Sequence, residues 1–402
     1  SSLAPEVLAT AFAEIDDWLK VRVCDSTDPA AVAAALRGLD PKKTLVIVAS
    51  KSGTTTETLS FAAYAAEWIG AAVGGAESAL SSMIAISDPS PCIDGIPGNE
   101  KMLDRFLNPA DIGGRYSALS FVGLVPASLL GIDLDPLLAA GSVAAAELRE
   151  PEPTANRAVA LGVVIGALAR EGRDKLTLVV DAPIDGFGAW AEQLVAESTG
   201  KHGVGVVPVD GEPLGAVSTY GEDRLFVRIK LDGGTAPRCA DGSDVDARLD
   251  ALAAAGHPVL EWTLNDRIDI GGEFVRWEAA TAFAGAVLNI NPFDEPNVTE
   301  SKTNTANVLA ELAANGALPE LPAKCSVDGL QLWVDDALPA AFADDAERLI
   351  AGQLDRLGAR GYIGIQAYIA STPGRTAALT KLRLALRDAT GRATTVGIGP
   401  RF

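Results

Sequence analysis

The sequence predicts an α/β fold with two three-layer α/β/α domains around parallel sheets, followed by a smaller C-terminal α/β extension. Short apolar strands alternate with segments of helical periodicity, which is the pattern of a parallel sheet covered by helices. An acidic, proline-containing stretch at 150–154 separates two such series, and a third begins after residue 320. We therefore expect domains at 1–150, 151–320 and 321–402.

Bulk composition narrows the classes of partner and compartment. With 402 residues, 48% of them hydrophobic and 21% charged, the chain has the composition of a globular protein. Its net charge of −20 argues against nucleic acid or an anionic membrane as a partner. No apolar run approaches the ~20 residues of a membrane span, and no basic-then-apolar leader opens the chain. Four widely spaced cysteines indicate reduced thiols, and two histidines are too few for a histidine-based metal site. We expect a cytoplasmic protein, and no motif suggests a metal or redox cofactor.

The first series of elements begins with a helix, because apolar residues recur at helical spacing from the first residues to Leu19. Residues 44–49 form an apolar, β-branched run that is typical of a strand buried on both faces. The other expected elements are a strand at 21–25, a helix at 28–36, a helix from 59 to about 73, a loop at 74–82, a strand at 83–87 and a buried helix at 118–130.

The segment at 50–58, Ser-Lys-Ser-Gly-Thr-Thr-Thr-Glu-Thr, carries six hydroxyl residues in nine positions between a strand and a helix. A helix N-terminus attracts anions through its backbone N–H groups and its dipole, and hydroxyls can donate further bonds to phosphate oxygens. One lysine suits a sugar phosphate better than a nucleotide polyphosphate. The alternative is an ordinary N-cap with Glu57 in a capping box, which needs only one hydroxyl. The predicted phosphate-binding residues are Ser50, Lys51, Ser52, Thr54 and Thr55.

A second motif, Gly-Gly-Arg-Tyr-Ser, lies at 113–117. Two glycines allow the backbone to approach a ligand closely, while the guanidinium of Arg115 can reach across it. From the residues alone, a turn with an exposed arginine is the favoured interpretation.

The second series contains a third motif at 190–201, Trp-Ala-Glu-Gln-Leu-Val-Ala-Glu-Ser-Thr-Gly-Lys. Gln193 and Glu197 are four residues apart, so they share one face of a helix. A carboxylate in the last helical turn meets the negative end of the dipole, which raises its pKa and favours a general base. The alternative is a solvated Glu/Gln face. The surrounding elements are a helix at 157–169, strands at 176–180, 224–231 and 259–264, and a helix at 274–288.

The fourth motif, at 289–302, follows that last helix. Pro296 and Asn297 are expected to begin a further helix that carries Lys302, whose alternative interpretation is an ordinary surface lysine. The extension is expected to add two βαβ-like turns. Its elements are strands at 330–334, 362–369 and 394–402 and helices at 344–357 and 376–389.

These four motifs together resemble those of the glucose-6-phosphate isomerase family, which is built from sugar isomerase domains. The family's motifs are Ser-Lys-Ser/Thr-x-x-Thr-x-Glu-Thr, Gly-Gly-Arg-Phe/Tyr-Ser, Gln-Leu-x-x-Glu-Ser-x-Gly-Lys and Phe-Asp-Gln-x-x-Val-Glu-x-x-Lys. The resemblance implies an aldose–ketose isomerase in which Glu197 is the base, moving a proton between C2 and C1 of the sugar through an enediolate. It further implies that Arg115 and Lys302 stabilise the oxyanion, and that Ser1, at the tail of a Gly-Gly-Ser-x-Leu loop, contacts the phosphate. Glu295 departs from the family's glutamine, and a carboxylate there would repel phosphate.

The whole chain resembles the isomerase part of a bacterial variant fused behind transaldolase. In the family a histidine within a Gly-Gln-x-His-like segment opens the sugar ring, but His202 and His257 lie in no such segment. We therefore expect the ring-opening histidine beyond residue 402 and the missing glycines before Ser1. Two alternatives remain open: a catalytically silent sugar-phosphate sensor, which would have no use for Glu197 beside Gln193, and an isomerase that also accepts mannose 6-phosphate. The oligomeric state is open as well, with a homodimer as the candidate assembly.

Overall fold

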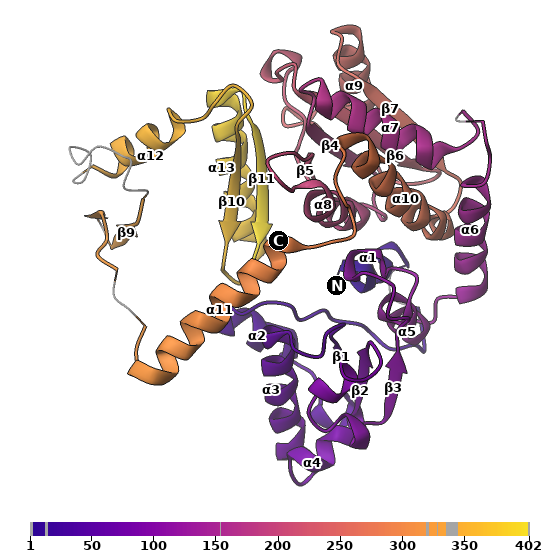
Figure 1. Cartoon of the computed structure of the whole chain (residues 1–402), viewed down its shortest axis with the longest axis vertical. Coiled ribbons are helices and arrows are strands. Elements are labelled where there is room, and N and C mark those ends of the chain that lie inside the picture. Colours follow the sequence, from indigo (N-terminus) through magenta and orange to yellow (C-terminus); the bar gives the residue numbers. More distant parts are fainter. Residues whose placement is uncertain are drawn as a thin grey trace.

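The structure is a computed structural model, and it describes residues 3–12, 15–152, 154–318, 321–327, 329–334 and 345–400. Its strands form three parallel sheets, with the orders β1-β2-β3, β5-β4-β6-β7 and β10-β11, and one antiparallel hairpin, β8-β9. Helices pack on both faces of the two larger sheets (Figure 1). The predicted α/β class with parallel sheets is thereby confirmed.

The first body is the sheet of β1 (Val46–Ala49), β2 (Met83–Ser87) and β3 (Asp104–Leu107) with its two helices. One face of the sheet packs against α3 (Thr56–Val73) and the other against α5 (Phe121–Leu129). The three layers position the segment between β1 and α3 at the carboxyl edge of the sheet.

One prediction for this region holds and one is wrong. The strand expected at 44–49 forms as β1, and both of its faces pack in core clusters, although it lies at the edge of the sheet and only Val48 is fully buried. The central strand is β2, whose five residues are all buried. No strand forms at 21–25, because no neighbouring strand pairs with that segment; instead, Arg22 donates to the carbonyls of Ala35 and Arg37.

Further differences concern the ends of elements. The first helix, α1, covers Leu3–Phe12 and does not reach Leu19, whereas α2 (Pro29–Leu36) matches its prediction. The side chain of Asp28 caps α2 by accepting from two backbone N–H groups, at 2.6 and 3.2 Å. The predicted loop at 74–82 contains a short helix, α4 (Ala76–Ala79), and a 3-10 turn.

The second body surrounds the sheet whose central strand, β4 (Lys175–Val180), is buried throughout. Helices α7, α8 and α10 cover one face of this sheet through aromatic and aliphatic side chains, and α9 covers the other. The bounds are β5 (Val207–Val209), β6 (Arg224–Leu231), β7 (Val259–Leu264), α7 (Arg157–Arg170), α8 (Gly186–Thr199), α9 (Val245–Ala254) and α10 (Ile270–Leu288).

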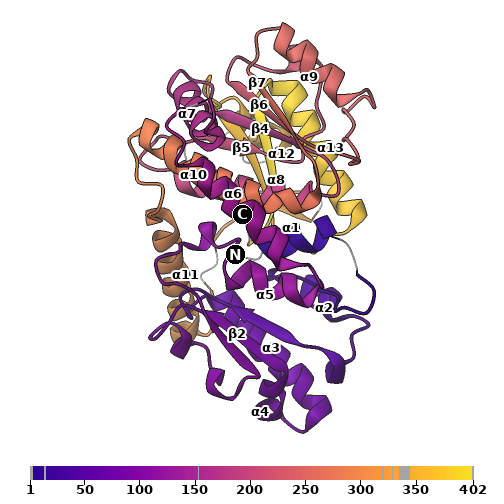
Figure 2. The same cartoon turned by 90° about the vertical axis from the view of Figure 1, so that its right-hand side faces the viewer.

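Two helices that precede residue 150 pack against the second body. Figure 2 shows α1 and α6 (Leu134–Glu147) lying against the helices of the second body, and Leu8 and Leu137 share one core cluster with Trp277 of α10. The N-terminal helices therefore help to bury the second sheet. The boundary at 150–154 stays a prediction.

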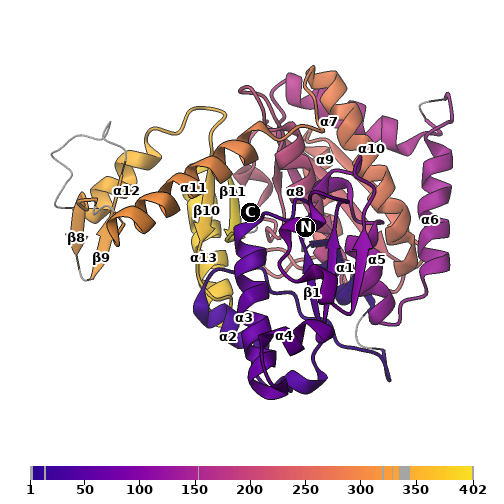
Figure 3. The same cartoon turned by 60° about the horizontal axis from the view of Figure 1, so that its bottom comes forward.

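After α10, helix α11 (Pro296–Asn315) leads away from both bodies towards the hairpin of β8 (Cys325–Val327) and β9 (Leu330–Leu332) and towards α12 (Ala346–Leu354) (Figure 3). None of its twenty residues is buried. None of the helices in the described parts of the chain has the length and apolar character needed to cross a membrane.

The C-terminal unit consists of β10 (Tyr362–Ala367), α13 (Pro373–Thr390) and β11 (Ala393–Ile398), which form one βαβ turn. The expectation of two such turns is wrong, because β9 pairs with β8 as a hairpin. Gly329, with a φ of 80°, supplies the left-handed conformation that this tight connection uses.

Two arginines of α13 are its buried residues, and they face the second body. Arg387 Nη1 lies 3.1 Å from Oε1 of Glu212, which follows β5, and the other oxygen of this carboxylate is 3.8 Å from Arg224 Nη1 of β6. The three side chains are at most 1% exposed. Tyr220 donates to the same carboxylate at 2.9 Å. A buried charged centre therefore joins the C-terminal unit to the second body.

Candidate active site

The hydroxyl loop, residues 50–55, is tied to the carboxyl end of the central strand β2. The N–H of Ser50 donates to the carbonyl of Ile86 at 3.0 Å. The carbonyl of Lys51 accepts from the N–H of Asp88 at 3.2 Å and from the hydroxyl of Ser87 at 3.1 Å. The strands of the first sheet end on the side that faces the second body (Figure 1), so the loop lies on that side too.

Gly53 is required by the close approach of two loops. Its φ is 65°, and a Cβ at this position would lie 1.8 Å from the carbonyl oxygen of Cys92. A Cβ at Gly95 would in turn lie 2.5 Å from the carbonyl oxygen of Gly53. The hydroxyl loop therefore packs backbone to backbone on the segment after β2, which holds its shape.

The hydroxyls of the loop do not serve as ordinary helix caps. Thr55 is the N-cap residue of α3, but its side chain caps no backbone N–H, and Glu57 stands one position too early for a capping box. Ser50 is buried and donates to the hydroxyl of Thr55 at 3.2 Å; the hydroxyls of Ser52 and Thr54 lie 2.9 Å apart. The N-cap alternative therefore leaves these hydroxyls unexplained.

Arg115 is buried, so it is not the exposed turn residue that its motif alone favoured. Its side chain is 5% exposed. The guanidinium donates to the hydroxyl of Ser198 at 2.6 Å and to the carbonyls of Pro292 and Asp294, both at 2.9 Å. These contacts bring three motifs together, from the 3-10 turn at 114–116, the end of α8 and the segment before α11.

Glu197 lies beside this arginine in the last turn of α8, one turn after Gln193. Its Oε1 is 3.6 Å from Arg115 Nε, and its side chain is 25% exposed. Burial raises the pKa of Glu197 above its ordinary value, while the Arg115 guanidinium acts in the opposite direction. The direction of the predicted shift in pKa is thus confirmed, but its chief cause is burial, whereas the prediction rested on the helix dipole. A carboxylate whose pKa is raised towards neutrality is suited to accept a proton.

Glu295, where the family has glutamine, is the N-cap residue of α11. Its Oε2 lies 3.8 Å from Arg115 Nη2, and its side chain is 47% exposed. Its charge contributes to raising the pKa of Glu197. The guanidinium of Arg115 therefore lies between two carboxylates.

Lys201 is a residue of this cluster that the sequence reasoning missed. Its side chain is 2% exposed, and its ammonium donates to the carbonyl of Asn291 at 2.6 Å and to the carboxylate of Asp294 at 2.5 Å. It holds the segment at 289–295 against the end of α8. The Gly-Lys ending of the third motif was the available signal.

One predicted site residue does not join the cluster. Lys302 is exposed on α11, and no hydrogen bond or ion pair in the described ranges joins it to Arg115 or Glu197. Ser1 lies outside the described residues. The hydroxyl loop also has no such contact with Arg115 or Glu197 among the residues described. The roles of all these residues stay predictions.

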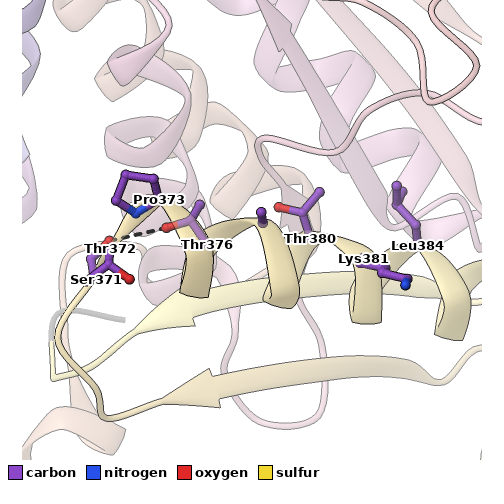
Figure 4. A pocket seen from close by; sticks show the side chains of 8 residues that line it. Ser371, Thr372, Pro373, Thr376, Thr380, Lys381 and Leu384 are labelled. Atoms are coloured by element: carbon purple, nitrogen blue, oxygen red, sulfur yellow. Dashed lines mark hydrogen bonds between the residues drawn. The ribbon is translucent and has the colours of Figure 1, made fainter.

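A groove of about 740 Å³ runs along α13 and is separate from these residues (Figure 4). The hydroxyls of Ser371 and Thr376 in its wall lie 3.3 Å apart. None of the predicted site residues lines it. Its lining residues are Ser371, Thr372, Pro373, Thr376, Ala377, Thr380, Lys381 and Leu384.

Comparisons with known proteins bear on this arrangement. The profile of the family described as "Phosphoglucose isomerase" matches residues 1–222. A "Glucose-6-phosphate isomerase" of Thermus thermophilus is 30% identical over 77% of this chain and 81% of its own. A "Probable glucose-6-phosphate isomerase" of Haloarcula marismortui is 32% identical over 77% of this chain and 76% of its own. A crystal structure of a glucose-6-phosphate isomerase from Chlamydia trachomatis is 21% identical, has a TM-score of 0.61 and covers 77% of this chain and 68% of that one, which shows a shared fold.

Proposed function

Because this chain belongs to the phosphoglucose isomerase family, we propose that it interconverts glucose 6-phosphate and fructose 6-phosphate. The observation that carries the proposal is the pair of Arg115 and Glu197. A half-buried carboxylate with a raised pKa lies 3.6 Å from a buried guanidinium, which places a proton acceptor next to a group that stabilises negative charge. A sugar-phosphate sensor would need neither.

In the proposed reaction Glu197 takes the proton from C2 of glucose 6-phosphate and returns it to C1. The proton of the C2 hydroxyl moves to the oxygen on C1, so that atoms balance between aldose and ketose. The enediolate formed between the two steps carries negative charge on oxygen. Arg115, held by four groups of the second half of the chain, is rigidly placed to stabilise that charge.

The direct test is an isomerase assay with glucose 6-phosphate, mannose 6-phosphate and fructose 6-phosphate, run beside exchange of the C2 hydrogen with solvent deuterium. Isomerisation of the first and third, with exchange, is the expected result. Tight binding of fructose 6-phosphate without isomerisation or exchange would make the chain a sensor. Conversion of mannose 6-phosphate at a similar rate would widen the substrate class.

Phosphate recognition is proposed for the hydroxyl loop. Replacing Ser50 and Thr55 by alanine is expected to raise KM for fructose 6-phosphate and Ki for inorganic phosphate by about tenfold or more, because each loses a hydrogen bond to a charged group. Ser81→Ala, on an exposed turn of the same body, is the control and should change neither constant. Unchanged phosphate inhibition in the double variant would place the phosphate elsewhere.

We also propose that a second copy of the chain covers α11. Val308, Leu309 and Leu312 expose an apolar stripe on a helix with no buried residue, and a helix in water needs such a face covered. Asn297, in its first turn, donates to the carbonyl of Gly200 at 3.1 Å, so a partner on α11 would adjoin the candidate site.

Light scattering is expected to give twice the mass of one chain, and Leu309→Glu should halve it, because it places a charge within the proposed interface. Leu382→Glu, on α13 with nearly the same exposure, 47% against 44%, is the matched control and should leave the mass unchanged. A monomeric wild-type protein would contradict the proposal.

A cytoplasmic location is proposed as well. All four cysteines are free thiols in the structure, which suits a reducing compartment. Detection of the protein outside the cytoplasmic fraction of its cells would contradict this.

A further inference from the structure

Lys51 is held at both ends by residues at the carboxyl end of β2. Its backbone carbonyl accepts from the N–H of Asp88 and the hydroxyl of Ser87, and its ammonium lies 2.8 Å from Oδ2 of Asp88. A lysine side chain that is already bound in this way has lost the freedom to follow an incoming anion. The charge of the only lysine in the hydroxyl loop is therefore committed before any ligand arrives.

Asp88 in turn depends on this lysine. The side chain of Asp88 is 7% exposed, and its Oδ1 is buried without a hydrogen-bond partner in the described part of the chain. A buried carboxylate with one unsatisfied oxygen is costly unless an opposite charge compensates it. Lys51, which is 42% exposed, is the cation within reach. The two form a pair whose net charge is zero. The pair belongs to the proposed phosphate site, the hydroxyl loop at 50–55, which we call the cradle.

We propose that Asp88 is a positioning residue that cancels the charge of Lys51, so that the hydroxyl loop recognises a sugar phosphate through hydroxyls and backbone N–H groups and not through a free cation. This inference rests on the proposed function, which assigns the phosphate to that loop. A neutral cradle binds the phosphate group by geometry and hydrogen bonding. It also avoids holding substrate and product so tightly that release becomes slow.

If Asp88 cancels the charge of Lys51, the affinity of the protein for phosphate should increase with the net charge of the pair. Asp88→Asn leaves the pair at +1 while keeping the shape of the side chain and the backbone N–H that holds the loop. The Kd of inorganic phosphate, measured by calorimetry, is expected to fall about three- to tenfold, and the gain should shrink at high salt because it is electrostatic. A carboxylate that only supported the loop would give the opposite sign, since its loss would loosen the cradle.

Lys51→Met leaves the pair at −1, and the Kd of inorganic phosphate should rise by a similar factor. The double variant, Asp88→Asn with Lys51→Met, is neutral again and is expected to bind phosphate about as tightly as the wild type. If the ammonium of Lys51 contacted the phosphate itself, the double variant would bind phosphate more weakly than the wild type, although its pair is neutral. The double variant therefore separates charge cancellation from direct contact.

Weaker phosphate binding by Asp88→Asn, or a double variant that stays weak, would overturn the inference. Should Asp88→Asn fail to fold, as judged by circular dichroism, Asp88→Ser removes the same charge and is read in the same way. Binding measurements on the wild-type protein distinguish a failure of this inference from a failure of the proposed function. If it binds neither inorganic phosphate nor fructose 6-phosphate, the cradle itself is wrong; if it binds phosphate and the charge series does not follow, only the role of Asp88 is wrong.

Discussion

Replacing Glu197 by glutamine is expected to lower kcat for fructose 6-phosphate by a factor of about 10²–10⁴, the usual contribution of a general base. KM should change little, because the amide keeps the size of the side chain and the phosphate is proposed to bind elsewhere. Exchange of the C2 hydrogen with solvent deuterium should disappear together with turnover. Exchange that persists in Glu197→Gln would show that another group handles the proton.

Glu295→Gln is the matched control, because both carboxylates lie within 4 Å of Arg115, at 3.6 and 3.8 Å. It should retain most of the activity, since Glu295 is the more exposed of the two and is not the proposed base. Loss of activity in Glu295→Gln together with retention in Glu197→Gln would exchange their roles.

Glu295→Gln is also expected to shift the pH profile of kcat/KM. The base works when it is ionised, so kcat/KM of the wild type should rise with pH through the pKa of Glu197 and then level off. Burial raises this pKa above the ordinary 4.5, and the charge of Glu295 adds to the rise. Glu295→Gln removes that charge, so the midpoint of the rise should move to lower pH. A midpoint that moves upward, or does not move, would contradict this assignment.

Replacing Glu212 by leucine is expected to lower the free energy of unfolding by about 3–5 kcal/mol, the cost of leaving buried charges without their partner. Arg224 and Arg387, whose side chains are 1% exposed, would then lose the carboxylate with which both pair. Because Arg387 belongs to α13 and Glu212 to the second body, the C-terminal unit should separate first. Urea unfolding and limited proteolysis measure the two effects.

Asp388→Asn is the control for this prediction, because Asp388 pairs with the same arginine at 2.8 Å but is 56% exposed. A solvent-exposed pair contributes about 0–1 kcal/mol, so this variant should unfold almost as the wild type does. Equal and small effects of both substitutions would mean that the buried centre does not hold the C-terminal unit in place.

Local pattern was sufficient for much of the fold and for the central residues of the candidate site. The run at 83–87 and the helical spacing of 157–169 predict β2 and α7 to within one or two residues of their bounds, because the periodicity of apolar residues reflects which face of an element is buried. Pro296 marked the start of α11 in the same local way. Glu197 and Arg115 were singled out by motif, and the structure brings them together.

Pairing between distant segments is where local pattern failed. The apolar run at 44–49 predicts the strand β1 but does not reveal its place at the edge of the sheet, because the choice of neighbouring strands depends on the whole sheet. The strand expected at 21–25 found no partner, and β9 paired with β8 instead of extending a parallel sheet.

By itself the sequence determined the α/β alternation, the position of the hydroxyl loop between a strand and a helix, and the helix face that carries Gln193 and Glu197. Only the tertiary structure decided that Asp88 neutralises Lys51, that Lys201 is buried against Asp294, and that burial raises the pKa of Glu197. The physical reason is the distance along the chain over which each effect acts. Periodicity and capping act over a few residues along the chain, whereas burial and ion pairing depend on which distant groups the fold places within a few ångströms of one another.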